Sequence, residues 1–155
     1  MSKKQLLIVA HAPSPNTRKL VDAVLAGAKH DDIEEVETRW LPPLETQPDD
    51  ILKADAIILG TTENLGYMSG ALKDFFDRCY YPVLEEKQGL PCCLYIRAGL
   101  DGTGTRRAVE SIVTGLRWNW VQEPIIFKGE WQDEFIDQAQ EIGQAMAAGL
   151  DSGVF

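Results

Sequence analysis

The sequence has few cysteines and no long apolar run. Only three cysteines occur among 155 residues, and two of them, Cys92 and Cys93, are adjacent within an apolar segment. Their odd number and spacing argue against a disulfide framework and a zinc site, so we expect reduced thiols in the core. The first apolar run, residues 5–10, is too short to cross a bilayer or to act as a signal sequence. We therefore expect a cytoplasmic protein without a membrane partner.

Positive charge is also scarce. Lys and Arg number 15 against 24 Asp and Glu, which gives a net charge of −9 at pH 7 and a pI near 4.7. This acidic balance argues against nucleic acid or an anionic membrane surface as a partner. The charge fits simple solubility, which is the default interpretation, or docking to a basic redox partner.

Several nucleotide-binding and catalytic motifs are missing. There is no G-x-x-x-x-G-K-[ST] sequence and no G-x-G-x-x-G after the first expected strand, which argues against nucleoside triphosphate and Rossmann-type dinucleotide sites. A receiver domain would need acidic residues where this chain has His11 and Gly60-Thr61. His11 and His30 lack the neighbours of a catalytic triad or a metal site. We therefore predict no catalytic acid or base and no metal ligand.

Apolar strands and amphipathic helices alternate along the chain. Strands are expected over residues 5–10, 33–41, 56–59, 90–96 and 121–127. Helices are expected over residues 16–29, 48–53, 69–81 and 131–148. A further helix is expected after the second glycine-rich loop, with Val109, Ile112, Val113 and Leu116 at core spacing. Right-handed crossovers between buried strands predict an α/β fold, a doubly wound five-stranded parallel sheet in the order 2-1-3-4-5. With 45% hydrophobic residues, the chain is expected to form a single domain, residues 1–155.

The loop after the first strand has the residues of a phosphate site. In such sheets ligands bind outside the carboxyl ends of the strands, where the loops after strands one, three and four converge. The first of these loops begins at His11, and Ser14, Asn16 and Thr17 supply side-chain donors. The helix that follows adds unpaired N–H groups and the positive end of its dipole. An ordinary helix cap is the alternative interpretation.

The stretch Gly60–Arg78 organises the rest of the chain. It joins a buried strand to an amphipathic helix through a polar loop, Thr61–Met68, that is longer than a connection requires. Ser69 is the expected N-cap of the helix. We interpret this stretch as one wall of a cofactor site, with an ordinary strand-to-helix connection as the alternative.

This stretch resembles the second cofactor loop of flavodoxin-like FMN proteins, especially the NAD(P)H-dependent FMN reductases and the tryptophan-repressor-binding-protein-type quinone oxidoreductases. Those families commonly read G-[ST]-P-x-Y-x-G-x-M-[ST]-G-x-L-K-x-F-x-D-R. The matching residues are Gly60, Thr61, Gly66, Met68, Ser69, Gly70, Leu72, Lys73, Phe75, Asp77 and Arg78. Thr62 and Asn64 stand where the families have proline and an aromatic residue, which leaves open what covers the flavin ring. Tyr67 is the nearest aromatic candidate.

Two further loops extend the resemblance. Asn16-Thr17-Arg18-Lys19-Leu20 matches an N-T-x-x-L pattern that binds the FMN phosphate in these families. The glycine-rich loop after the fourth strand is similar to their third cofactor loop, beside the polar edge of the flavin. Glycines there let the backbone approach a planar ligand, although a flexible connection is the alternative.

The resemblance implies a flavodoxin-like fold that binds FMN noncovalently through these three loops. The implied cofactor-binding residues are His11, Ser14, Asn16, Thr17, Thr61, Thr62, Glu63, Asn64, Leu65, Gly66, Tyr67, Met68, Ala98, Gly99, Asp101, Gly102 and Gly104. Negative charge from Glu63 or Asp101 near the ring would lower the flavin potential. Arg97, Arg106 and Arg107 are candidates to attract the phosphates of a nicotinamide dinucleotide, with solvated surface charges as the alternative.

Three functions follow from this resemblance. The first is an NAD(P)H-dependent oxidoreductase that passes hydride through FMN to free flavin, a quinone or a similar acceptor. The second is a flavodoxin-type electron carrier that has a protein redox partner and no substrate of its own. The third is a binding module that has lost flavin, which the residues Thr62 and Asn64 keep open. A homodimer that completes the flavin site is a further expectation.

Overall fold

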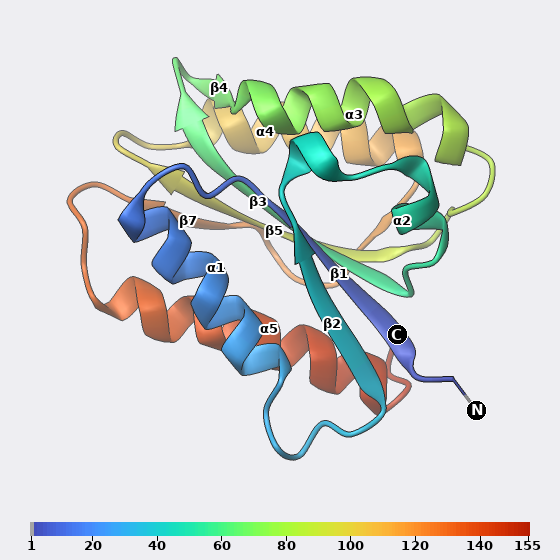
Figure 1. Cartoon of the computed structure of the whole chain (residues 1–155). Coiled ribbons are helices and arrows are strands. Elements are labelled where there is room, and N and C mark those ends of the chain that lie inside the picture. Colours follow the sequence, from blue (N-terminus) through green and yellow to red (C-terminus); the bar gives the residue numbers. More distant parts are fainter. Residues whose placement is uncertain (1) are drawn as a thin grey trace.

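The computed structural model describes residues 2–155, so Met1 of the predicted domain lies outside the described residues (Figure 1). The strands are β1 (Lys4–Ala10), β2 (Val36–Leu41), β3 (Ala56–Asn64), β4 (Tyr67–Met68), β5 (Pro91–Ala98), β6 (Asn119–Trp120) and β7 (Ile125–Lys128). The helices are α1 (Pro15–Ala28), η1 (Pro43–Glu45), α2 (Pro48–Leu52), α3 (Gly70–Val83), α4 (Thr103–Leu116) and α5 (Glu134–Asp151).

The sheet confirms the predicted fold class and strand order. Its order is β2-β1-β3-β5, and both β6 and β7 pair with β5 in parallel. The predicted strand 121–127 is confirmed only at its end, where β7 begins at Ile125. Residues 121–124 lie in no strand, and the short strand β6 precedes them. Pro124 lies between β6 and β7 and has no N–H to donate to a ladder, which explains the interruption.

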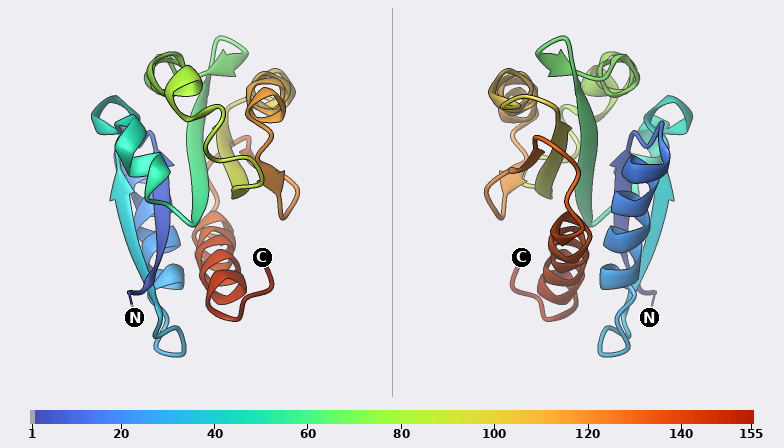
Figure 2. Two further views of the ribbon diagram at one scale, coloured as in Figure 1. Left: turned by 90° about the vertical axis from the view of Figure 1, so that its right-hand side faces the viewer. Right: turned by 90° about the vertical axis from the view of Figure 1, so that its left-hand side faces the viewer.

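Helices cover both faces of the sheet (Figure 2). One apolar cluster joins the sheet to α1 and α5, and the other joins it to α3 and α4. The backbones of α1 and α5 touch at two glycines. A methyl group at Gly27 would come within 1.9 Å of the Gln140 carbonyl oxygen, and one at Gly143 within 1.9 Å of the Val24 carbonyl oxygen.

The stretch predicted as a long polar loop, 61–68, is a β-hairpin, and the loop prediction is wrong. Strand β3 continues to Asn64, and β4 pairs with it in antiparallel register. The two turn residues, Leu65 and Gly66, have φ values of 53° and 76°, as a type I′ turn requires. The end of β3 resembles a loop in sequence because its last four residues are all polar, and its last two, Glu63 and Asn64, pair only with β4.

Helix α3 continues past the predicted end at Tyr81. Pro82 lies inside its last turn, where the helix runs to Val83. The helix ends with a hydrogen bond from the Leu84 N–H to the Tyr81 carbonyl, at 3.3 Å. A proline in the final turn removes only one helical hydrogen bond, so the helix is shortened less than expected.

The three thiols are free and buried, as predicted. Burial raises the pKa of Cys79 to about 11 and that of Cys92 to about 12. Across residues 2–155 no helix is long and apolar enough to cross a membrane, and no His, Cys, Asp and Glu side chains group as metal ligands.

Candidate cofactor site

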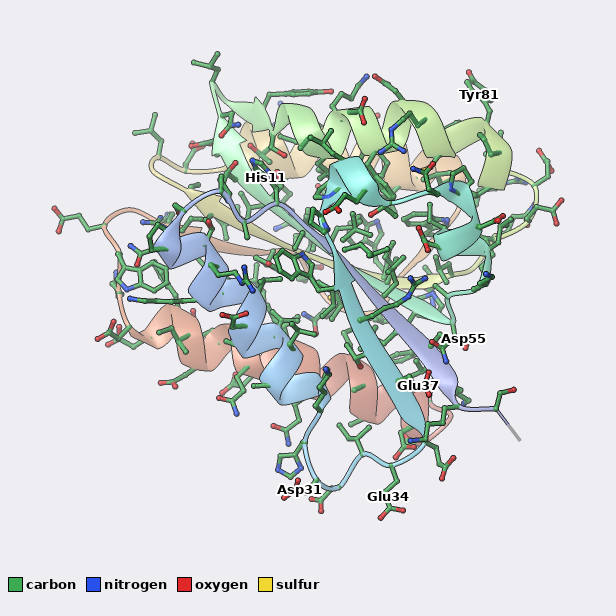
Figure 3. The ribbon with its side chains drawn as sticks, viewed as in Figure 1. His11, Asp31, Glu34, Glu37, Asp55 and Tyr81 are labelled. Carbon is green, nitrogen blue, oxygen red and sulfur yellow. The ribbon has the colours of Figure 1, made fainter. Side chains whose placement is uncertain are left out.

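The loops after β1, β3 and β5 meet at the carboxyl edge of the sheet. The N–H of His11 donates to the Gly60 carbonyl at 3.0 Å, which fixes the first loop against β3. Figure 3 shows His11 at this edge, while Asp31, Glu34 and Asp55 lie at the opposite end of the molecule. Burial lowers the pKa of His11, so its imidazole is neutral at pH 7.

Ser14 and Thr17 cap helix α1 reciprocally. The Thr17 N–H donates to the Ser14 hydroxyl at 3.2 Å, and the Ser14 N–H donates to the Thr17 hydroxyl at 2.9 Å. The Thr17 hydroxyl also donates to the Ser14 carbonyl at 3.1 Å, so it is engaged within the cap. The Ser14 and Thr17 hydroxyl oxygens lie 2.8 Å apart, so the Ser14 hydroxyl donates to Thr17 and is engaged in the cap as well. Since Pro13 and Pro15 have no N–H, the first-turn donor that is left for an anion here is the N–H of Asn16.

Tyr95 carries a buried hydroxyl at the same end of the sheet. Its ring lies across Gly60, where an added methyl group would come within 2.5 Å of the hydroxyl oxygen. Gly60 pairs with Ala10, the last residue of β1, so the hydroxyl lies near the end of β1 on the face that α1 and α5 cover. Among the described residues the hydroxyl has no hydrogen-bond partner. A buried polar atom of this kind indicates a missing polar partner, either water or a ligand.

The predicted cofactor-binding residues of the second loop fall into a buried group and an exposed group in the hairpin. Thr61 and Met68 are buried, and the Thr61 hydroxyl accepts from the Ser69 N–H at 3.0 Å, so both serve the hairpin itself. Asn64, Leu65, Gly66 and Tyr67 are exposed at the tip. The Thr62 hydroxyl donates to the Asn64 side-chain oxygen at 2.9 Å. The exposed tip residues are therefore the ones that can meet a ligand.

Glu63 connects the hairpin to the third loop. Its carboxylate accepts from the Gly102 N–H at 2.9 Å and from the Leu100 N–H at 3.3 Å. These two bonds are called the Glu63 bridge below. The hairpin also touches the start of α4, where the Thr105 hydroxyl donates to the Tyr67 carbonyl at 3.0 Å.

The third loop is short and ordered by its own residues. Strand β5 runs to the buried Ala98, so the loop itself spans residues 99–102. Gly102 has a φ of 72°, and a methyl group at Gly104 would come within 2.4 Å of the Gly66 carbonyl oxygen. Hydrogen bonds from the N–H and hydroxyl of Thr103 lower the pKa of Asp101. Asp101 is therefore a carboxylate at neutral pH and caps this turn.

Two of the three predicted arginines, Arg97 and Arg106, are engaged in structural contacts, whereas Arg107 is exposed. Arg97 donates to the Ala98 carbonyl at 2.8 Å and to the Phe127 carbonyl at 3.0 Å. Arg106 forms ion pairs with Glu110 and Glu123. These contacts favour the alternative interpretation for both residues.

Sequence reasoning missed two aromatic residues at this edge. Tyr95 is concealed within the apolar run of β5, and its only sequence signal is a tyrosine among aliphatic residues. Trp131 follows β7, where Lys19 and Arg97 each place their charged group 5.9 Å from a Trp131 ring centroid. No sequence pattern brings Lys19, Arg97 and Trp131 together, because each comes from a different part of the chain.

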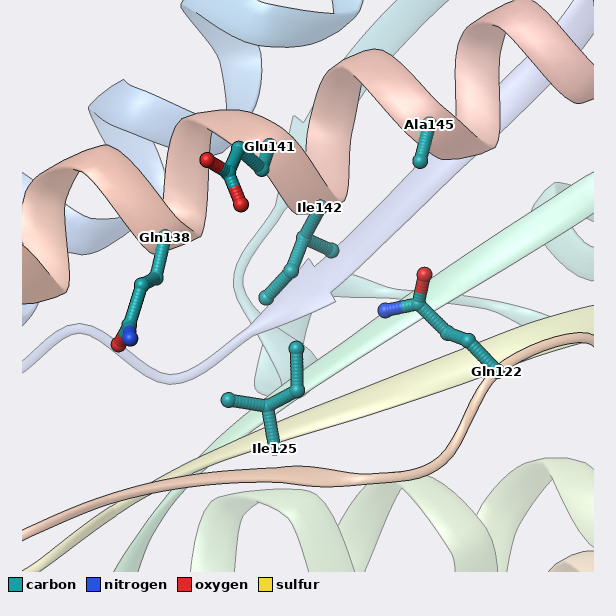
Figure 4. Close-up of a pocket in the computed structure, with 6 residues that line it drawn as sticks. All are labelled: Gln122, Ile125, Gln138, Glu141, Ile142 and Ala145. Carbon is teal, nitrogen blue, oxygen red and sulfur yellow. The ribbon is translucent and has the colours of Figure 1, made fainter.

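Two of the surface cavities lie near the predicted site or against α5. One of about 400 Å³ lies between α5 and the segment that leads into β7, where Ile125 and Ile142 point toward one another (Figure 4). None of the predicted cofactor residues lines it. The other, of about 350 Å³, lies beside the first loop and is lined mainly by apolar side chains, with His11 and Glu45 as its ionisable groups.

Comparison with known sequences identifies the family. The sequence profile of the family described as NADPH-dependent FMN reductase matches residues 4–133. The chain belongs to the NADPH-dependent FMN reductase family. This membership confirms the resemblance seen in the second loop.

Relatives of this FMN reductase family member include proteins named flavodoxin. A flavodoxin of Aquifex aeolicus is 30% identical over 112 residues, which span 72% of this chain but only 60% of that protein. A solved archaeal flavodoxin has a TM-score of 0.76 at 16% identity, covering 94% of this chain and 98% of the other. A flavodoxin, WrbA-like protein from Agrobacterium tumefaciens has a TM-score of 0.75 at 18% identity, covering 97% and 99%. At these identities the solved structures support the fold alone.

Proposed function

We propose that this protein binds FMN at the carboxyl edge of its sheet and catalyses NAD(P)H-dependent reduction of free flavin, a quinone or a similar acceptor. The observation that carries the proposal is the meeting of three loops at that edge in a chain of the NADPH-dependent FMN reductase family. The family name supports both FMN and the nicotinamide as partners of this chain.

The residues at the edge fit an FMN molecule. The first-turn N–H of Asn16 suits the phosphate, because the start of α1 favours a negative group. The Ser14 hydroxyl would join it by turning from the Thr17 hydroxyl to the phosphate. The unpartnered Tyr95 hydroxyl is a further donor on the α1 side of the sheet. The N–H groups of Leu100 and Gly102 already hold a carboxylate, which supports a role for them in binding acceptor atoms such as flavin carbonyls.

Bound FMN would supply the hydride chemistry, and the protein would supply position and electrostatics. The exposed hairpin tip has Asn64 in place of an aromatic residue, so a flavin ring held there would remain accessible to a second planar molecule. Asp101 keeps a negative charge at the third loop, which disfavours additional negative charge on a nearby ligand.

A flavodoxin-type electron carrier is the second candidate. It is favoured by the 30% identity to the Aquifex aeolicus flavodoxin. A carrier needs no site for a nicotinamide, and it would exchange electrons with a protein partner. Reaction with NAD(P)H therefore separates the two candidates.

An anaerobic titration tests the proposal. The purified protein is titrated with FMN while its absorption and fluorescence are followed, and then NADPH and NADH are added separately. Tight binding followed by bleaching of the flavin band is the expected result. Binding without bleaching by either nicotinamide would favour the carrier, and no spectral change at micromolar FMN would overturn FMN binding altogether.

A further inference from the structure

The Glu63 bridge joins two segments that are already docked by other contacts. The Thr105 hydroxyl bonds the Tyr67 carbonyl at 3.0 Å, and Gly104 lies against the Gly66 carbonyl with no room for a side chain. These contacts hold the hairpin on the start of α4 without the carboxylate. Glu63 therefore contributes something other than docking.

The two N–H groups that Glu63 holds belong to a turn that faces the carboxyl edge. Leu100 is 80% exposed, and Gly102 adopts a positive φ that aims its N–H at the Glu63 carboxylate. Two N–H donors on one acceptor group form a small site for carbonyl or anionic oxygens. In the structure, a side chain of the protein itself fills that site.

We infer that Glu63 competes with FMN for the Leu100 and Gly102 N–H groups, so that binding of the flavin ring replaces the Glu63 bridge with bonds to flavin carbonyls. This inference rests on the proposed function. Hydrogen bonds to a charged acceptor are roughly twice as strong as neutral ones, so the carboxylate is an effective competitor. The released carboxylate then lies beside the flavin and adds negative charge there.

The substitution Glu63→Gln tests this exchange of the Glu63 carboxylate for flavin carbonyls. A neutral amide offers one oxygen acceptor, and its NH₂ group cannot accept from the second N–H. We expect E63Q to bind both FMN and riboflavin about tenfold more tightly than the wild type, since one charge-assisted hydrogen bond corresponds to about that factor. The gain is equal for the two ligands because it arises at the ring and not at the phosphate.

The matched control is Glu130→Gln. Glu130 follows Gly129, whose N–H donates to the Ala98 carbonyl at 2.9 Å, so it lies in the neighbouring segment at the same edge. This variant removes one negative charge and leaves both loop N–H groups in the Glu63 bridge. A change in affinity of less than twofold is expected. An equal tightening in E130Q would show that net charge alone explains the effect, and would overturn the exchange.

Two further measurements complete the test. In the flavin-free wild type, amide hydrogen exchange at Gly102 should be slow, and it should become about tenfold faster in E63Q, as loss of one such hydrogen bond implies. In the wild type, added FMN should shift the carboxyl carbon resonance of Glu63. A resonance that stays unchanged at saturating FMN overturns the exchange.

The outcomes separate the exchange from the proposed function. If the wild type binds FMN and E63Q binds it equally or more weakly, the exchange is wrong and the function stands. If E63Q binds FMN and the wild type does not, the exchange is supported. If neither protein binds FMN, both the exchange and the proposed function are overturned.

Discussion

At the scale of single residues, Tyr95 combines a buried position with a polar group that no described residue bonds. Burying an unsatisfied hydroxyl costs free energy, and deleting the hydroxyl without changing the ring removes that cost. We expect Tyr95→Phe to leave the free energy of unfolding unchanged or to raise it by up to about 1 kcal/mol. Urea unfolding measures this, with Tyr80→Phe as the half-buried control. A loss of stability in Y95F alone would show that the hydroxyl has a bound water as partner.

Leu65 is a second residue whose local conformation lowers the stability of the fold. It is fully exposed at the hairpin tip and has a φ of 53°, a conformation that costs about 1 kcal/mol for a residue with a branched side chain. Asn tolerates this conformation, so we expect Leu65→Asn to raise the free energy of unfolding by roughly 0.5–1 kcal/mol. The control is Leu44→Asn, also at an exposed leucine but in η1. Equal effects from both variants would mean that exposure, not backbone conformation, sets the stability.

At the scale of elements, the contact between α1 and α5 depends on two glycines. A methyl group at Gly143 would lie 1.9 Å from the Val24 carbonyl oxygen, which is backbone and cannot rotate away. Gly143→Ala must therefore separate the helices and open the core, and we expect a loss of about 3 kcal/mol or more, as for other severe core changes. Gly70→Ala, at the open start of α3, should be neutral or slightly stabilising. Thermal unfolding of both variants checks this, and equal melting temperatures would contradict it.

The strands and helices also differ in how far the sequence could predict them. Apolar runs identified β1, β3 and β5 and their order, because burial between helices leaves a continuous apolar pattern. The hairpin was missed because its turn has Leu65 where asparagine or aspartate usually signals a type I′ turn. In the candidate site, the loop positions were predictable from topology. The Glu63 bridge was not, because a hydrogen bond between residues 37 to 39 positions apart leaves no local pattern.

At the scale of the whole molecule, the buried thiols couple stability to alkaline pH. Burial raises the pKa of Cys79 to about 11 and of Cys92 to about 12, above the value of about 8.5 in an unfolded chain. The unfolded chain then releases protons first, so stability is fully present below about pH 8.5 and falls as the pH rises toward 11. Each thiol lowers the free energy of unfolding by up to about 1.4 kcal/mol per pH unit in that range.

Urea unfolding at pH 8, 9 and 10 measures this loss. The control is Cys92→Ala, which lacks one of the titrating thiols and should therefore lose less stability between pH 8 and pH 10 than the wild type does. Identical slopes in the two proteins would show that other groups, such as lysines and tyrosines, cause the alkaline loss.

The pairing of α1 with α5 has a consequence for synthesis on the ribosome. The face of the sheet that these helices share cannot be closed until α5 has been translated, since Gly143 supplies the surface on which α1 packs. At roughly 5–20 residues per second, the interval between completing α1 and completing α5 lasts on the order of 5–25 s. During that time the nascent chain displays Leu20, Val21 and Val24 without their native cover. This face of the sheet is therefore completed only after α5 has left the ribosome, and until then its apolar side chains are accessible to a chaperone.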